Sequence, residues 1–241
     1  MRINEDRCIG CGNCIPICPG TCISLRDSKA VIDHANCLEC GLCYRISICP
    51  ADAFVKETAE LDPEGSIKAT LSDPLTEYSV TGITGRGTEE MKTNDVTEKI
   101  GYGEVGICVD VGRPNVGTSL ADVEKLVMAL APLLGEKGYW FERDNPVTSF
   151  IQDHETGKFY PDIPDIRVMS AIIEFRIPLD SLVRVVDLLE EESQHINTVF
   201  TVGVIERISE TEEIISKKIL EQKGYRISDR GKINLGLGKR T

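Results

Sequence analysis

The chain has 241 residues, 41% of them hydrophobic, and its 27 Lys and Arg against 39 Asp and Glu give a formal net charge of -12. This acidity disfavours a nucleic-acid-binding protein, because phosphate contacts require a positive surface. No apolar run approaches the roughly 18 residues of a membrane helix, and the charged start MRINEDRC lacks the apolar core of a signal peptide. We therefore expect a cytoplasmic protein that binds neither nucleic acid nor a membrane.

The first predicted element is a repeat of cysteines. Nine of the ten cysteines lie between Cys8 and Cys49, in two similar runs that start 29 positions apart (37 minus 8). The first run reads C-x2-C-x2-C-x3-C-P, and the second also ends in Cys-Pro. In a cytoplasmic protein, this spacing indicates metal or redox chemistry rather than disulfides. The candidate ligands are Cys8, Cys11, Cys14, Cys18, Cys37, Cys40, Cys43 and Cys49.

Two 4Fe–4S clusters explain this spacing. A cube presents four irons that each take one thiolate, and two-residue gaps let one tight loop reach three corners. Gly12 and Gly41 hold matching places in the two runs, where glycine tolerates positive φ and close backbone approach. Structural zinc is the alternative, but zinc sites usually pair two C-x2-C knuckles and lack this triple with a closing Cys-Pro. Residues 22–33, between the runs, are predicted to form a hairpin.

Residues 1–57 resemble the bacterial-type 2(4Fe–4S) dicluster ferredoxins. The resemblance implies that the fourth cysteine of each run binds the cluster of the other run. One cluster is then bound by Cys8, Cys11, Cys14 and Cys49, and the second by Cys37, Cys40, Cys43 and Cys18.

The second run departs from the family pattern. Five residues, 44–48, precede its last cysteine, where the usual gap is three. We expect this insertion to change the surroundings of the cluster held by Cys49, so that the two clusters differ in potential. Cys22 and Cys108 are left over and are predicted to be small buried residues. The alternatives are that Cys22 replaces a ligand and that Cys108 is a regulatory thiol.

Residues 58–103 are predicted to form an extended surface connector. Turn signals occur at residues 62–65 and 72–74, and residues 81–88 are rich in glycine. No Gly-Lys-Ser/Thr follows, so this segment is not a P-loop. An alternative function is that Gly85, Arg86 and Gly87 contact a partner's cofactor or an anionic substrate.

Residues 104–207 are predicted to form an α+β domain without a cluster. Strands are expected at 105–111, 139–143, 167–177 and 198–207, with helices at 119–132 and 180–195. The order βαββαβ is that of the ferredoxin-like sandwich, an antiparallel sheet with two helices on one face. The long loop at 144–166 is expected to be an ordered lid or docking surface.

Residues 208–241 are predicted to form a third helix from Ser209, then a hairpin through residues 229–231. Eight Lys and Arg lie between Lys217 and Thr241, opposed only by Glu221 and Asp229. This basic tail is either a solvated surface or a docking segment for an acidic partner. The three histidines form no metal or triad pattern, and we identify no catalytic residues.

Residues 84–90, 106–118 and 231–238 resemble the iron–sulfur part of 6-hydroxynicotinate reductase, whose family reduces an aromatic nitrogen heterocycle with ferredoxin electrons. This resemblance implies a reductase component that depends on a partner. We predict an electron-transfer protein or subunit that serves a flavin- or metal-containing reductase in a hetero-oligomer. The alternatives are a ferredoxin-dependent reductase whose α+β domain binds the substrate, and a redox or ligand sensor.

Overall fold

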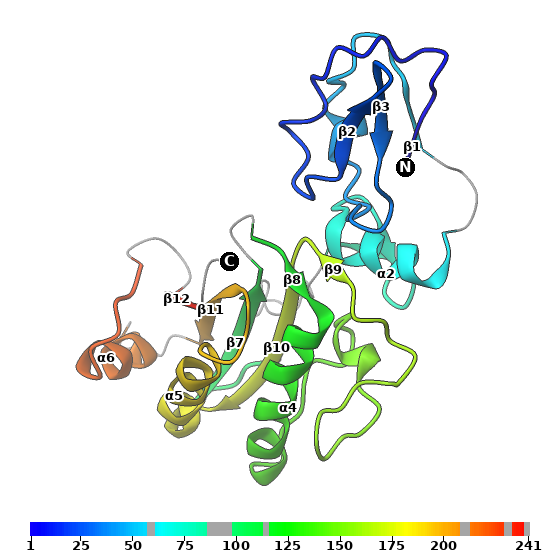
Figure 1. The fold of residues 1–241 in the computed structure, drawn as a ribbon. Coiled ribbons are helices and arrows are strands. Elements are labelled where there is room, and N and C mark those ends of the chain that lie inside the picture. The colour runs from blue at the N-terminus through cyan, green and yellow to red at the C-terminus, as the bar shows by residue number, and fades with distance from the viewer. Residues whose placement is uncertain (57–60, 86–97, 113–115, 208–212, 229–232, 239–241) are drawn as a thin grey trace.

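The computed structural model describes residues 1–56, 61–85, 98–112, 116–207, 213–228 and 233–238. Figure 1 shows two parts, the N-terminal module (residues 1–56) and the C-terminal module (from residue 98 onward), with helix α2 (Pro63–Ser72) between them. In the described ranges, no helix combines the length and apolar composition needed to cross a bilayer.

The N-terminal module is built on short antiparallel pairs. Strands β2 (Ile23–Arg26) and β3 (Lys29–Ile32) form the predicted hairpin. Strand β1 (Arg2–Ile3) pairs with β4 (Phe54–Val55), so the two ends of the module meet. The single-turn helix α1 (Leu42–Arg45) contains Cys43 and the first two residues of the 44–48 segment that precedes Cys49. A few buried side chains pack among the cysteines, namely Met1, Ile23, Ala30, Ala53 and Phe54.

The connector differs from the prediction, because it contains a helix. The segments interpreted as turns are the two ends of α2: Asp62 is its N-cap, with Oδ1 accepting from Gly65 N at 2.7 Å, and Asp73 is its C-cap. Proline at the first helical position suits this start, since it has no N–H to leave unsatisfied. The short strands β5 (Glu77–Tyr78) and β6 (Ile83–Thr84) pair after the helix.

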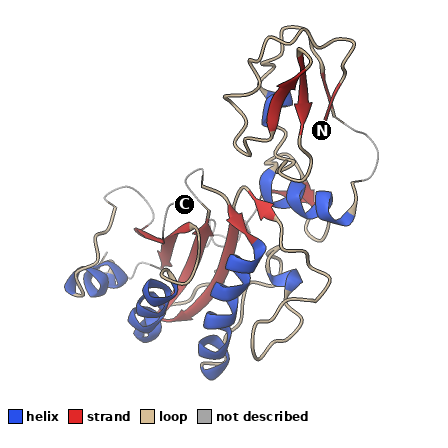
Figure 2. Ribbon diagram, viewed as in Figure 1, coloured by secondary structure: helices blue, strands red, loops and turns tan. Residues whose placement is uncertain are grey.

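The C-terminal module is a four-stranded antiparallel sheet with helices on one face (Figure 2). The strand order is β10 (Ala171–Pro178), β7 (Glu104–Val111), β11 (Val199–Glu206), β12 (Ile233–Gly238). Helices α4 (Leu120–Glu136) and α5 (Leu182–Glu192) pack against the sheet. Alternate β7 residues, Val105, Ile107, Val109 and Val111, are fully buried in this core. Cys108 lies between two of these alternate residues and belongs instead to a small cluster with Ile100 and Ile172.

Several predicted elements of this module differ in the structure. The strand expected at 139–143 is reduced to one bridge between Phe141 and Phe175, whose rings meet edge-on at 5.9 Å. The strand expected at 167–177 is divided into β9 (Arg167–Val168), which pairs with β8 (Thr118–Ser119), and β10. Strand β12 extends the sheet beside β11. The βαββαβ sandwich therefore stays a prediction, while the mixed helix and sheet composition is observed.

The remaining C-terminal predictions are only partly covered. Helix α6 (Ile215–Gln222) lies within the helix expected from Ser209, but residues 208–212 fall outside the described residues. The turn predicted at 229–231 also lies outside them. The short 3-10 turn η2 (Leu179–Ser181) precedes α5, which is why this helix begins later than expected.

The structure describes the whole of the long loop at 144–166. It contains the 3-10 turn η1 (Thr148–Phe150) and an isolated bridge between Ile151 and Phe159. Phe150 and Phe159 are buried in the core and their rings lie 5.8 Å apart. The loop is thus anchored by its aromatic side chains, and its role as a lid or docking surface stays a prediction.

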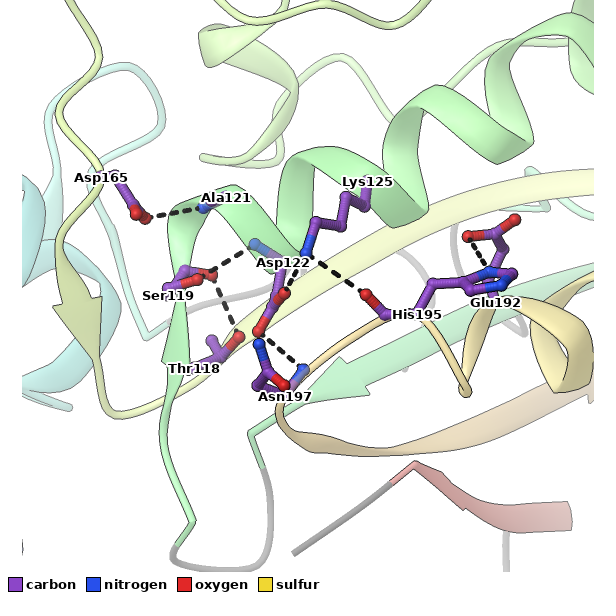
Figure 3. Close-up of polar contacts among 9 residues, drawn as sticks. All are labelled: Thr118, Ser119, Ala121, Asp122, Lys125, Asp165, Glu192, His195 and Asn197. Atoms are coloured by element: carbon purple, nitrogen blue, oxygen red, sulfur yellow. Dashed lines mark hydrogen bonds and ion pairs between the residues drawn. The ribbon is translucent and has the colours of Figure 1, made fainter. Parts of the chain in front are cut away.

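The N-terminus of α4 provides a direct test of the fold. Ser119 Oγ accepts from Asp122 N at 3.1 Å, and Asp165 Oδ1 accepts from Ala121 N at 3.0 Å (Figure 3). We expect Ser119→Ala to lower the free energy of unfolding by about 1 kcal/mol, because one helix N–H loses its acceptor. Denaturant titration measures this loss. Ser119→Asn keeps an acceptor and should stay close to wild type; equal stability of the alanine variant and wild type would contradict the assigned cap.

Candidate metal centre

Four cysteines from both halves of the repeat line one cavity in the N-terminal module. Three come from the loop after β1, and Cys49 comes from the end of the second run. These are the four residues that the ferredoxin resemblance assigns to one cluster. We call Cys8, Cys11, Cys14 and Cys49 the first set. The cavity is also lined by Ile3, Ile9, Gly12, Ala30 and Phe54, among others.

The backbone around the first set suits an anionic group. Ala30 N donates to Cys8 Sγ and Ala53 N donates to Cys49 Sγ, each at 3.3 Å. Such N–H donors stabilise negative charge on cluster sulfurs. Gly10 has a φ of 68°, and a Cβ there would lie 2.1 Å from Ser28 O, so only glycine allows this close approach between loop and hairpin.

The other four predicted ligands also lie together. We call Cys18, Cys37, Cys40 and Cys43 the second set. Burial and the charge of neighbouring cysteines raise the pKa of the Cys43 thiol to about 12. The neighbours that contribute are Cys40, Cys37 and Cys18. The ferredoxin resemblance assigns these four cysteines to one cluster, in a crossed arrangement in which Cys18 of the first run joins three cysteines of the second run.

Burial and neighbouring cysteines also raise a thiol pKa in the first set. Burial raises the pKa of the Cys14 thiol, and the charges of Cys11, Cys8 and Cys49 raise it further. Four thiolates gathered in a partly buried site repel one another, so cations are needed to hold them all deprotonated. The irons of a cluster supply that charge, and soft thiolates are the ligands that iron–sulfur clusters use. The residues present therefore fit two clusters.

Cys22 is closer to the metal centre than the sequence indicates. The residue is buried, as predicted, with its Sγ 3.4 Å from Cys18 Sγ. Its hydrogen bond to Cys37 lowers the pKa of that thiol. The second set therefore has a fifth cysteine beside it, signalled in the sequence only by its position four residues after Cys18. Cys108 is also buried, but in the C-terminal module, where its Sγ lies 3.6 Å from Glu174 Oε1.

The predicted anion-binding segment is only partly described. Gly85 has a φ of 100°, and a Cβ added there would meet open space. Arg86 and Gly87 lie outside the described residues, so their role stays a prediction. Among the side chains that the structure describes, no three His, Cys, Asp or Glu are arranged to hold a single metal ion.

A polar cluster at the start of α4 serves the fold (Figure 3). The buried Asp122 accepts from Lys125 Nζ at 2.9 Å and from Asn197 N at 3.0 Å. Lys125 also donates to the carbonyl of His195, whose exposed ring lies beside Glu192. These contacts fasten the turn before β11 to α4. Like His195, His34 and His154 are exposed.

Two sets of four cysteines on interleaved loops define an iron–sulfur protein with two 4Fe–4S clusters. Comparison with known proteins identifies the family of this iron–sulfur protein. A family model described as a 4Fe-4S dicluster domain matches residues 7–53. Through this segment, the chain belongs to the 4Fe–4S dicluster ferredoxin family.

Three of the curated proteins that the chain resembles align with it over 55 to 59 residues. Pyruvate synthase subunit PorD of Methanothermobacter marburgensis is 40% identical over 23% of this chain and 62% of its own length. A ferredoxin of Rickettsia felis is 34% identical over 24% of this chain and 52% of its own. A ferredoxin-like protein in the vnf region of Azotobacter vinelandii is 34% identical over 23% and 91%. The chain thus spans less than two thirds of the first two relatives. No solved structure matches it.

Proposed function

We propose that this chain is an electron-transfer protein or subunit that passes low-potential electrons through its two clusters to a partner reductase. One relative is named as a subunit of pyruvate synthase, which supports a role inside a multisubunit enzyme. The partner is proposed to carry a flavin or a metal and to be of the 6-hydroxynicotinate reductase type. We further propose a cytoplasmic location.

The exposed surface beside the first set carries this proposal. Cys11 is exposed, and the adjacent Ile9 is 67% exposed. Ile15 and Leu25 are also exposed, and both have a Cδ1 atom 3.9 Å from the Cβ position of Gly12. We call Ile9, Ile15 and Leu25 the apolar rim. Exposed apolar residues gathered at a functional group mark an interaction surface. A partner protein with an apolar contact face would bring its own redox group close to this cluster.

Residues that neighbour the second set in sequence contact α2, which lies between the two modules. Lys68 of α2 donates to the carbonyl of Ala35, two residues before Cys37, at 3.3 Å. Asp73 at the end of α2 forms an ion pair with Arg45, two residues after Cys43. The two clusters therefore provide a path from the apolar rim to the side of the module that adjoins the rest of the chain.

Anaerobic isolation of the tagged full chain from its native host tests this function. We expect a complex with a subunit that contains a flavin or a metal. Ile9→Asp should reduce recovery of that subunit about tenfold, because burial of an apolar side chain contributes about 1.5–3 kcal/mol. Val80→Asp, at a position 66% exposed in the connector, serves as the matched control. Equal recovery with both variants would contradict docking at the apolar rim.

A cavity in the C-terminal module favours a second candidate, a ferredoxin-dependent reductase with its own substrate site. This cavity of about 280 Å³ lies between the first turn of α4 and the long loop. Its lining includes Leu120, Glu124, Lys158, Phe159, Tyr160 and Asp165. A lone protein that reduces a heterocyclic substrate would favour this candidate. A lone protein without such activity, whose clusters respond to a bound metabolite, would favour a sensor.

A further inference from the structure

Arg45 and Asp73 form a largely buried ion pair against the second set. Arg45 Nη1 lies 2.6 Å from Asp73 Oδ1, and the side chain of Asp73 is only 5% exposed. The same nitrogen donates to the carbonyl oxygen of Cys40. The pair joins the insertion in the second cysteine run to the end of α2, 28 residues later.

The cluster loop is shaped to receive this guanidinium. Gly41 has a φ of 64°, and a Cβ there would lie 2.9 Å from Arg45 Nη1 and 3.4 Å from Asp73 Oδ2. Any larger residue at this position would displace the pair. Arg45 therefore rests directly on the backbone between Cys40 and Cys43.

Asp73 is itself held by the rest of the chain. Its Oδ1 also accepts from Leu75 N at 3.1 Å, and Lys56 Nζ lies 3.6 Å from Oδ2. The preceding residue, Ser72, accepts from Met169 N of the C-terminal module at 2.9 Å. A short run of contacts thus leads from the C-terminal module through Asp73 to the loop of the second set.

We propose that Arg45, positioned by Asp73, sets the reduction potential of the cluster bound by the second set and links this cluster to the C-terminal module. The proposal rests on the ligand assignment in the proposed function. Reduction adds negative charge to a cluster, and a nearby partly buried cation stabilises that charge, so Arg45 raises the potential. This differs from the sequence prediction, in which the insertion acts on the cluster held by Cys49.

Charge-changing variants of the full chain separate an electrostatic role from a structural one. Arg45→Gln should shift one of the two couples to lower potential in an EPR-monitored redox titration. Asp73→Asn keeps an oxygen acceptor for Arg45 but removes the opposing charge, so the same couple should shift to higher potential. The double variant should lie between the two. A merely structural role would move both single variants in the same direction, and that result would overturn the proposal.

Two further sets of variants complete the test. Cys11→Ser and Cys40→Ser identify the couples of the first and second sets, and the couple that responds to Arg45→Gln must be the one altered by Cys40→Ser. Arg184→Gln, on α5 and paired with Glu136 in the C-terminal module, is the matched control and should move neither couple. If Arg45→Gln shifts the potential of the first-set couple, or shifts both potentials equally, the proposal is overturned. The iron content of the wild-type protein tests the proposed function separately from the role of Arg45. If the wild-type protein holds about eight irons and shows two redox couples, the proposed function stands even when Arg45→Gln shifts neither potential.

Discussion

Replacing Cys49 with alanine should leave about four irons and four sulfides per chain, whereas the wild-type protein reconstituted under anaerobic conditions should hold about eight of each. The cluster that is lost should be the one bound by the first run, although Cys49 belongs to the second. The reason is the shared cavity, in which Cys49 faces Cys8, Cys11 and Cys14. Iron and acid-labile sulfide assays measure the loss, and EPR of the remaining cluster identifies which one persists.

Paired variants make this test independent of general damage to the module. Cys11→Ala should give the same remaining EPR signal as Cys49→Ala, and the double variant should still hold about four irons. Cys40→Ala should leave the other signal. Cys108→Ala, a buried cysteine of the C-terminal module, should keep about eight irons. A Cys49→Ala signal identical to that of Cys40→Ala would contradict the crossed arrangement. The first set gives the clearer test, because Cys22 lies beside Cys18 in the second set and could replace a ligand removed there.

Leu71→Ala should lower the free energy of unfolding of the C-terminal module by about 2–5 kcal/mol. Leu71 belongs to α2 but is fully buried in the core of that module. Its truncation removes apolar contacts and leaves a cavity that the surrounding helices and strands cannot fully close. Thermal or denaturant unfolding followed by circular dichroism measures the loss.

The clusters and a neighbouring leucine provide the controls. Iron content of Leu71→Ala should stay at about eight, because the cysteines are held by their own loops. Leu75→Ala, at a position 63% exposed in the same segment, should change stability by no more than about 0.5 kcal/mol. Similar losses in the two variants would show that α2 does not belong to the core of the C-terminal module.

The metal centre was predictable because its chemistry imposes local spacing. Two-residue gaps suit a single loop that reaches three corners of a cube, so the eight candidate ligands can be predicted without knowledge of the fold. The helices at 120–136 and 182–192 were also anticipated, since each carries an apolar stripe over several turns. These features depend on residues close in sequence.

Other features depend on contacts that the sequence does not display. Helix α2 has little apolar periodicity, and its stability comes from contacts with both modules, although Asp62-Pro63 is itself a recognised helix start. Residues 139–143 were predicted to form a short strand, yet the Tyr139 hydroxyl donates to Glu104 at 2.7 Å and, within this segment, Phe141 alone forms a bridge. The pairing of Arg45 with Asp73 requires the position of α2, which no local pattern provides.

Helix α2 also limits how this chain can change in length. Leu71, Ser72 and Asp73 are consecutive, and each contacts a different neighbour: the apolar core, the backbone of Met169 and Arg45. One residue inserted into the helix ahead of them would rotate all three by about 100°. No single adjustment restores three contacts that point in different directions. Substitutions on the exposed face of α2 are therefore tolerable, whereas insertions and deletions within it are not.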